Sequence, residues 1–165
     1  YGEKALQLFA DAHICVVGIG GVGSWAAEAL ARTGIGAITL IDMDDVCVTN
    51  TNRQIHALRD NVGLAKAEVM AERIRQINPE CRVTVVDDFV TPDNVAQYMS
   101  VGYSYVIDAI DSVRPKAALI AYCRRIKSHW SQPVARVGRL TRRRFRLPIW
   151  RKRFRTRWRR SCVSA

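Results

Sequence analysis

Short apolar runs alternate with amphipathic stretches along residues 1–125. Four runs have the length of buried strands: residues 14–17, 37–41, 82–86 and 103–108. Apolar positions at helical spacing predict helices beside them: residues 2–11, 24–32, 64–77, 91–99 and 115–125. Because strands that alternate with helices form parallel sheets covered on both faces, we predict an α/β, Rossmann-like, doubly wound, mainly parallel sheet.

A glycine-rich turn connects the first predicted strand to the next helix. Residues 18–23 read GIGGVG and contain four glycines: Gly18, Gly20, Gly21 and Gly23. Glycine lets the backbone turn tightly and approach phosphate, while free N–H groups at the helix N-terminus bind anions. Asp42 ends the second strand, where a carboxylate accepts hydrogen bonds from ribose hydroxyls. This unit predicts a nucleotide site; the alternative is that the glycines only pack a tight turn.

A long polar segment, residues 43–66, follows the second strand and contains few candidates for the core. Loops of this length are usually functional or disordered. The segment holds polar and charged side chains of the kind found around phosphates: Asp44, Asn50, Asn52, Arg53, Gln54 and Lys66. The alternative is an ordinary solvated loop.

Two carboxylates mark the end of the fourth predicted strand. Asp108 ends this strand and Asp111 follows three residues later. In a doubly wound sheet the ligand binds at the carboxyl ends of the strands, so both side chains are expected near Gly18 and Asp42. Carboxylates there can hold magnesium against a polyphosphate. For Asp111 the alternative is a cap on the next helix.

Charge is distributed unevenly along the chain. The net charge is +11, but residues 1–123 contain all 15 acidic residues and only 10 of the 26 basic ones. Residues 124–165 therefore form a strongly basic segment without acids. The five cysteines are scattered, without the spacing of a zinc site or a disulfide framework. With no signal peptide and no run of about 18 apolar residues, we expect a cytoplasmic protein without a transmembrane segment.

These motifs together resemble the ubiquitin-activating-type ATP-binding family, which includes the ThiF-like enzymes that adenylate molybdopterin and thiamine sulfur carriers. The resemblance rests on five features in the right order: GIGGVG at 18–23, D-x-D at 42–44, TNTNRQ at 49–54, Lys66, and DAIDS at 108–112. Within this family the runs at 24–54 and 109–124 are similar to the bacterial tRNA threonylcarbamoyladenosine dehydratases.

The resemblance implies ATP-dependent, magnesium-dependent adenylation of a carboxylate, with tRNA carrying threonylcarbamoyladenosine as the substrate. Its other implied partners are a sulfur-transfer or carrier protein and a second copy in a homodimer. The glycines at 18–23 would face the nucleotide, Asp42 the ribose, and Asp111 the magnesium ion. The nucleotide site would further include these residues: Asp44, Asn50, Arg53, Gln54 and Lys66. Arg53, Lys66 and Asp111 would form the catalytic set.

Three other functions remain open at this point. The first is activation of a ubiquitin-like sulfur-carrier protein. The second is an oxidoreductase that binds NAD or FAD. Such an enzyme has no use for Arg53 and Lys66 together, so this function is disfavoured. The third is RNA binding by the basic segment, through phosphate contacts and stacking on its Trp and Phe residues.

The resemblance stops at Ile126. Residues 126–165 show neither helical nor strand periodicity. Codons can be chosen so that a shifted frame, starting at the third base of the Ile126 codon, reads KIPLVTTGGAGRKIDPTQIQVTD and predicts a strand, a glycine turn and a helix. We therefore expect residues 1–125 to be the N-terminal part of an adenylation domain and 126–165 to be an out-of-frame, disordered tail. This predicts an incomplete sheet with an exposed edge beside the fourth strand, and impaired activity. The start at Tyr1 instead of Met leads us to expect an incomplete N-terminus.

Overall fold

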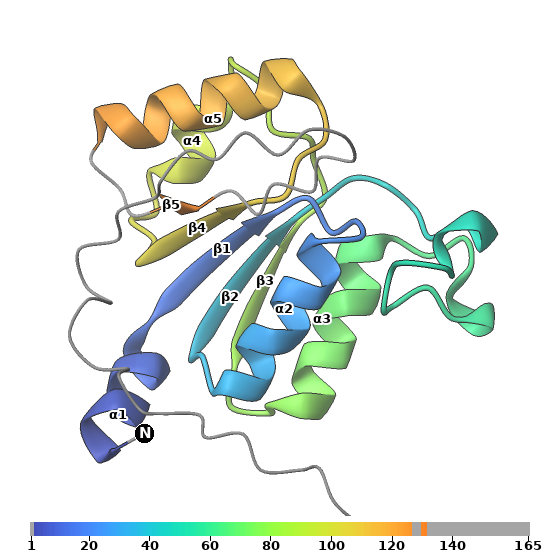
Figure 1. Cartoon of the computed structure of the whole chain (residues 1–165), viewed down its shortest axis with the longest axis horizontal. Coiled ribbons are helices and arrows are strands. Elements are labelled where there is room, and N and C mark those ends of the chain that lie inside the picture. Colours follow the sequence, from blue (N-terminus) through green and yellow to red (C-terminus); the bar gives the residue numbers. More distant parts are fainter. Residues whose placement is uncertain (1, 127–129, 132–165) are drawn as a thin grey trace, which may run out of the picture. The chain divides into compact units, whose positions relative to one another are not determined.

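The computed structural model describes residues 2–126 and 130–131, which form alternating helices and strands (Figure 1). The α-helices are α1 (Glu3–Asp11), α2 (Gly23–Thr33), α3 (Lys66–Ile77), α4 (Val95–Met99) and α5 (Val113–Arg125). The strands are β1 (His13–Val17), β2 (Ala37–Ile41), β3 (Arg82–Val86), β4 (Tyr105–Asp108) and β5 (Trp130–Ser131). Two 3-10 turns, η1 (Val48–Asn50) and η2 (Arg59–Asn61), lie between β2 and α3.

The strands form one parallel sheet in the order β3-β2-β1-β4-β5. The chain runs outward from β1 in one direction to β3, then returns to β4 on the other side of β1. This reversal confirms the predicted doubly wound sheet. It also places a topological switch point between β1 and β4, where such folds bind ligands outside the carboxyl ends of the strands.

Helices cover both faces of the sheet. Figure 1 shows α2 and α3 on one face and α4 and α5 on the other. Alternation along β1 explains this: Ile14 and Val16 pack in the core beneath α2 and α3, whereas Cys15 and Val17 pack in the core beneath α4 and α5. Strands buried on both faces read as continuous apolar runs, which is why the sequence predicts them well.

The segment between β2 and α3 is mostly polar and exposed, as predicted. It contributes Val46, Ala57 and His56 to the interior, all with exposed fractions of 3% or less. Val46 also pairs by backbone hydrogen bonds with Gly63 and Leu64, which closes the segment into a compact loop. Val46 and Ala57 are the buried hydrophobic residues of this long segment, which agrees with the expectation of few core residues. Short apolar residues separated by polar ones carry no periodic signal, so only tertiary packing shows that they are buried.

The predicted tail, residues 126–165, lies almost entirely outside the described residues. The prediction that it is disordered therefore stays a prediction. The two residues of β5 belong to it, and they pair with Val106 and Ile107 of β4. The prediction of an exposed edge beside the fourth strand is therefore wrong at this position. The prediction of an incomplete adenylation domain at 1–125 stays a prediction.

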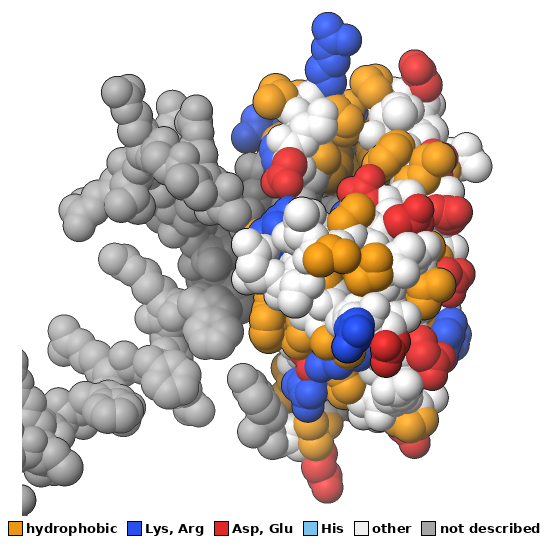
Figure 2. All heavy atoms as spheres, turned by 90° about the vertical axis from the view of Figure 1, so that its right-hand side faces the viewer, with side chains coloured by type: hydrophobic (Ala, Val, Ile, Leu, Met, Phe, Trp, Pro, Cys, Tyr) orange, Lys and Arg blue, Asp and Glu red, His pale blue; other side chains and the backbone are white. Residues whose placement is uncertain are grey.

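The described surface agrees with the acidic balance of residues 1–123. Figure 2 shows one face on which acidic, basic and hydrophobic side chains are interspersed, without a broad basic patch on the described part. Within the described residues, no helix is both long enough and apolar enough to cross a membrane.

Candidate functional site

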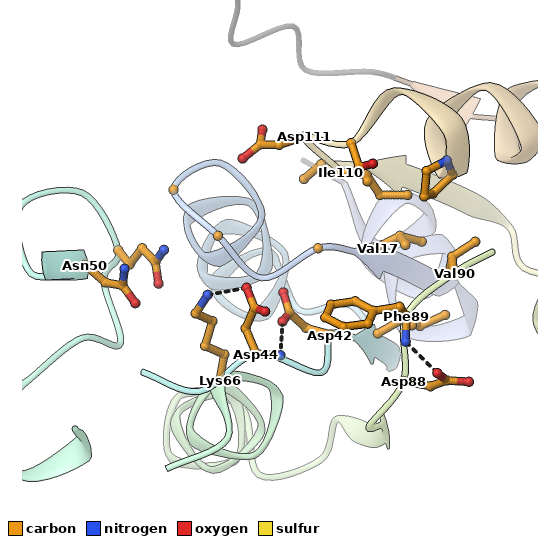
Figure 3. A pocket seen from close by; sticks show the side chains of 18 of the residues that line it. Val17, Asp42, Asp44, Asn50, Lys66, Asp88, Phe89, Val90, Ile110 and Asp111 are labelled. Atoms are coloured by element: carbon orange, nitrogen blue, oxygen red, sulfur yellow. Dashed lines mark hydrogen bonds and ion pairs between the residues drawn. The ribbon is translucent and has the colours of Figure 1, made fainter. Parts of the chain in front are cut away.

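A cavity of about 920 Å³ lies at the carboxyl edge of the sheet. Ten of the predicted site residues line it: Gly18, Gly20, Gly21, Asp42, Asp44, Asn50, Arg53, Gln54, Lys66 and Asp111. Figure 3 shows Asp42, Asp44 and Lys66 on one side of the cavity and Asp111 on the other. The parallel topology explains this gathering, because every strand ends at the same edge.

The glycine turn forms the wall between β1 and α2. Gly18 has φ +89°, and a Cβ there would lie 2.8 Å from the carbonyl oxygen of Ala109, so a side chain is excluded on both grounds. At Gly20 a Cβ would meet no described atom within 4 Å, and this glycine leaves open space in the cavity. The turn therefore brings bare backbone to the cavity, as a phosphate site requires.

Gly23 has a different place from the other three glycines. It does not line the cavity, and a Cβ there would lie 1.7 Å from the carbonyl oxygen of Gly18. The residue allows the first turn of α2 to pack directly against the end of β1. Its contribution to the site is therefore the position of the helix and not a wall of the cavity.

Asp42 fixes the glycine turn to the end of β2. Its carboxylate accepts backbone N–H groups from Ile19 at 2.5 Å and from Asp44 at 2.8 Å, and the residue is only 8% exposed. Burial raises the pKa of Asp42 above its ordinary value, and the two hydrogen bonds and the charge of Lys66 oppose this rise. Each carboxylate oxygen accepts more than one hydrogen bond, so Asp42 retains acceptor capacity for a ligand hydroxyl.

Lys66 brings a cation to the cavity at the start of α3. Its ammonium lies 2.8 Å from Asp44 Oδ2, and its backbone N–H donates to the Asp44 carbonyl at 2.9 Å. The Lys66 side chain is 8% exposed, whereas that of Asp44 is 55% exposed. Asp44 thus compensates the charge of a largely buried lysine while remaining solvated itself. An anionic ligand entering the cavity would meet this ammonium.

The segment around η1 supplies the remaining polar groups. Asn50 is 7% exposed and its side-chain oxygen accepts the Cys47 N–H at 2.9 Å. The Arg53 guanidinium donates to the Thr49 carbonyl at 2.9 Å and to Asn52 Oδ1 at 3.0 Å. Asn50 therefore shapes the loop, while the Arg53 guanidinium is held by the loop at the edge of the cavity.

Asp111 lies on the opposite wall, after β4. It is exposed to the cavity, and the N-cap of α5 is Ser112, so the alternative that Asp111 caps this helix is wrong. Asp108 is 1% exposed and forms an ion pair with Lys116 at 2.9 Å. Of the two carboxylates at this strand end, Asp111 is the one open to a ligand.

Sequence reasoning missed the wall that follows β3. Residues 88–91 all line the cavity, and Phe89 presents an aromatic ring that is 51% exposed. Asp88 accepts hydrogen bonds from the Phe89 N–H at 2.7 Å and from the Tyr98 hydroxyl. The position of this segment after a strand was the available signal, since β3 ends at the same edge as β1 and β2.

The cavity therefore combines a cation, several carboxylates, bare glycine backbone and an apolar wall. The glycine turn and Lys66 suit a phosphate chain, Asp42 suits a ribose, and Phe89 and Val90 suit a flat apolar group. No cluster of three or more His, Cys, Asp or Glu side chains suited to a metal occurs in the described part of the chain.

Comparison with known proteins agrees with this geometry. The family model described as ThiF matches residues 1–141. The chain belongs to the ThiF family. It is 99% identical over 127 residues to a tRNA threonylcarbamoyladenosine dehydratase of Escherichia coli strain K12, a match that covers 77% of this chain and 47% of that protein. It is 36% identical over 122 residues to a molybdopterin-synthase adenylyltransferase of Salmonella typhimurium, covering 74% of this chain and 47% of that protein.

Solved structures similar to this chain include the same E. coli dehydratase. A crystal structure of the E. coli tRNA N6-threonylcarbamoyladenosine dehydratase in complex with ATP matches with a TM-score of 0.80 and 95% identity, over 80% of this chain and 54% of that one. The complex of the same enzyme with AMP matches with a TM-score of 0.79 and 95% identity, over the same shares of the two chains. This ThiF-family chain thus spans about half the length of the relatives it matches.

Proposed function

We propose that this chain binds ATP and belongs to an enzyme that adenylates the threonyl carboxylate of threonylcarbamoyladenosine in tRNA. The observation that carries the proposal is the meeting of the glycine turn and Lys66 in one cavity at the switch point of the sheet. Its support from comparison is the 95% identity to a protein crystallised with ATP.

Different residues of the cavity would bind different parts of the nucleotide. The backbone around Gly20 would approach the phosphates, and the spare acceptor sites of Asp42 would take ribose hydroxyls. Lys66 and Arg53 would offset the negative charge that builds on the phosphates during transfer. The Lys66 ammonium is already held at the cavity by Asp44, so little rearrangement is needed to meet a phosphate.

The chemistry explains why ATP is used. A carboxylate is a poor electrophile because its leaving group would be oxide. Attack of one carboxylate oxygen on the α-phosphorus of ATP forms an acyl adenylate and releases pyrophosphate. The side-chain amide nitrogen of the modified adenosine then attacks the acyl carbon, the carbon–oxygen bond to AMP breaks, and a ring closes with loss of a proton from nitrogen. The net change in the nucleoside is loss of water.

Magnesium fits the same site as a cofactor. Magnesium is usually held by one or two carboxylates together with phosphate oxygens and water. Asp111 is an exposed carboxylate on the cavity wall and could supply such a ligand. When bound, the ion would neutralise part of the triphosphate charge.

The partners follow from this proposal. The tRNA would be the substrate, and a cytoplasmic location would follow from it. A sulfur-transfer or carrier protein and a second copy of the chain are the other partners that the family resemblance implies. Activation of a carrier protein remains the competing function, because one similar relative is an adenylyltransferase of molybdopterin synthase.

The first test is calorimetric titration of the full chain with ATP in the presence and absence of magnesium. We expect saturable, magnesium-dependent binding that Asp42→Ala and Arg53→Ala both weaken. Glu80→Ala is the matched control, because Glu80 is an exposed acid in the turn before β3, away from the cavity lining. Absence of binding by the folded protein would refute the proposal.

The second test separates the substrates. Pyrophosphate exchange into ATP is measured with threonylcarbamoyladenosine-modified tRNA, and in parallel with a ubiquitin-like sulfur-carrier protein. Exchange that requires the modified tRNA would support the proposed function. Exchange that requires the carrier protein would favour the competing one.

A further inference from the structure

Trp25 connects the glycine turn to the loop that carries Arg53. It stands in the first turn of α2, two residues after Gly23, and its side chain is 54% exposed. The indole N–H donates a hydrogen bond to the backbone carbonyl of Arg53 at 3.0 Å, across 28 residues of sequence. Indole has a single donor and no acceptor, so Trp25 commits its entire hydrogen-bonding capacity to this one carbonyl.

The peptide that Trp25 holds is also fixed from its other end. The backbone N–H groups of Arg53 and Gln54 both donate to the Asn50 carbonyl, at 3.1 and 3.0 Å. The hydrogen bond from Trp25 therefore ties the backbone of Arg53 to α2, while the bonds to the Asn50 carbonyl tie it to η1. The backbone of Arg53 cannot rotate without breaking one of these hydrogen bonds.

The stem of Arg53 touches the glycine turn itself. A Cβ built on Gly21 would lie 3.4 Å from Arg53 Cγ and 3.5 Å from Cδ, so the arginine methylene groups pack over Gly21. Trp25 in the first turn of α2 and Gly21 in the glycine turn just before it thus both contact Arg53, Trp25 at the backbone and Gly21 at the side chain. Arg53, Gly20 and Gly21 all line the cavity.

We propose that Trp25 is a positioning residue for nucleotide binding, which acts by holding Arg53 against the glycine turn. This inference rests on the proposed ATP site and deepens it. Its physical basis is that a preorganised cation binds phosphate without first losing conformational freedom. Trp25 itself lies outside the lining of the cavity, so its effect would pass through Arg53.

The decisive variant is Trp25→Phe in the full chain, which keeps an aromatic ring and removes the N–H donor. We expect ATP affinity to fall about three- to tenfold, the range that corresponds to loss of one net hydrogen bond. Affinity for adenosine should stay unchanged, because Arg53 acts on phosphate. The matched control is Thr33→Val, which removes the hydrogen bond to the Ala29 carbonyl at the other end of α2 and should leave ATP affinity as it is.

A double-mutant cycle separates positioning from general stability. In an Arg53→Ala background the Trp25→Phe change should have no further effect on ATP affinity, since the side chain being positioned is gone. Equal losses for ATP and adenosine, additive losses with Arg53→Ala, or unchanged ATP affinity in Trp25→Phe would each overturn the inference. Failure of the unchanged protein to bind ATP would overturn the proposed function as well, so the two failures are distinguishable.

Discussion

Asp42 Oδ2 accepts a hydrogen bond from the backbone N–H of Ile19 at 2.5 Å, across 23 residues of sequence. This contact ties the glycine turn after β1 to the end of β2. Because Asp42 also accepts the Asp44 N–H, one carboxylate connects two of the segments that line the cavity. The same group that is expected to bind a ribose therefore also shapes the site.

Asp42→Ala should lower the free energy of unfolding by about 1–3 kcal/mol, because two backbone donors lose a buried acceptor. ATP binding should be weakened as well. Urea unfolding followed by circular dichroism measures the first effect, and calorimetry measures the second. Asp87→Ala is the control: Asp87 is an exposed acid just after β3, and its loss should change stability by no more than about 0.5 kcal/mol.

Lys66→Met should weaken ATP binding by about tenfold or more, because it removes a charged partner of the phosphates. It should leave stability nearly unchanged, since methionine fills similar space and Asp44, 55% exposed, remains solvated without its partner. Calorimetry with ATP and with adenosine tests whether the loss of affinity is specific to the ligand that carries phosphates. If both ligands lost affinity equally, Lys66 would not be acting on phosphate.

His56 should make stability depend on acid pH. Burial, together with the nearby charges of Lys66 and Arg73, lowers its pKa from 6.5 to about 4. Between these values the unfolded chain binds the proton and the folded chain does not, so stability is full above about pH 6.5 and falls as the pH drops towards 4. The total loss should be on the order of 3 kcal/mol, at about 1.4 kcal/mol for each unit of pKa difference between the folded and unfolded states.

His56→Leu should remove this part of the pH dependence. Urea unfolding of both proteins across this pH range isolates the contribution of His56, because other titrating groups, including His13, are common to the two. Parallel curves for the two proteins would show that His56 titrates normally in the folded state.

Glu28 should be a strong stabilising contact between α2 and α3. Its carboxylate is 8% exposed and lies 2.6 Å from Arg73 Nε and 2.6 Å from an Arg32 nitrogen. Glu28→Ala should cost about 1.5–3 kcal/mol of unfolding free energy, the range for hydrogen bonds to a charged group, because Arg73 loses both of its bonds to this buried carboxylate. Glu72→Ala is the control, since Glu72 is 62% exposed and 3.6 Å from Arg75, and it should cost less than about 1 kcal/mol. Equal losses in chemical unfolding of the two variants would contradict this assignment.

Gly23→Ala and Gly20→Ala should separate folding from binding. At Gly23 the new methyl group would overlap the Gly18 carbonyl, so the variant should lose most of its stability or fail to fold. At Gly20 the methyl group meets no described atom, so the variant should fold normally and bind ATP more weakly, because the methyl group enters the cavity. Thermal unfolding and calorimetry on the soluble variants distinguish the two results.

The course of the strands was predictable because it depends on local patterns. Apolar runs typical of strands buried on both faces predicted β1 and β2 with little error. The alternation of strands and helices along the chain predicted the doubly wound sheet. Boundaries were less accurate: α3 begins at Lys66 and β4 at Tyr105, two residues later than predicted in each case. Terminal residues of an element are fixed by capping and packing, which the periodicity of the interior does not report.

The sequence by itself determined that the glycine turn, Asp42 and Asp111 meet at one edge, because parallel strands all end on the same side of their sheet. The place of Lys66 near the phosphates was implied only by the family resemblance. Tertiary structure decided which groups are free to act. It placed Gly23 in the packing of α2, buried His56, brought Phe89 to the cavity and joined Trp25 to Arg53. These contacts join residues that are distant along the chain, and they depend on the packing of whole elements. Apart from the position of Phe89 after a strand, local sequence patterns therefore carry no direct signal for them.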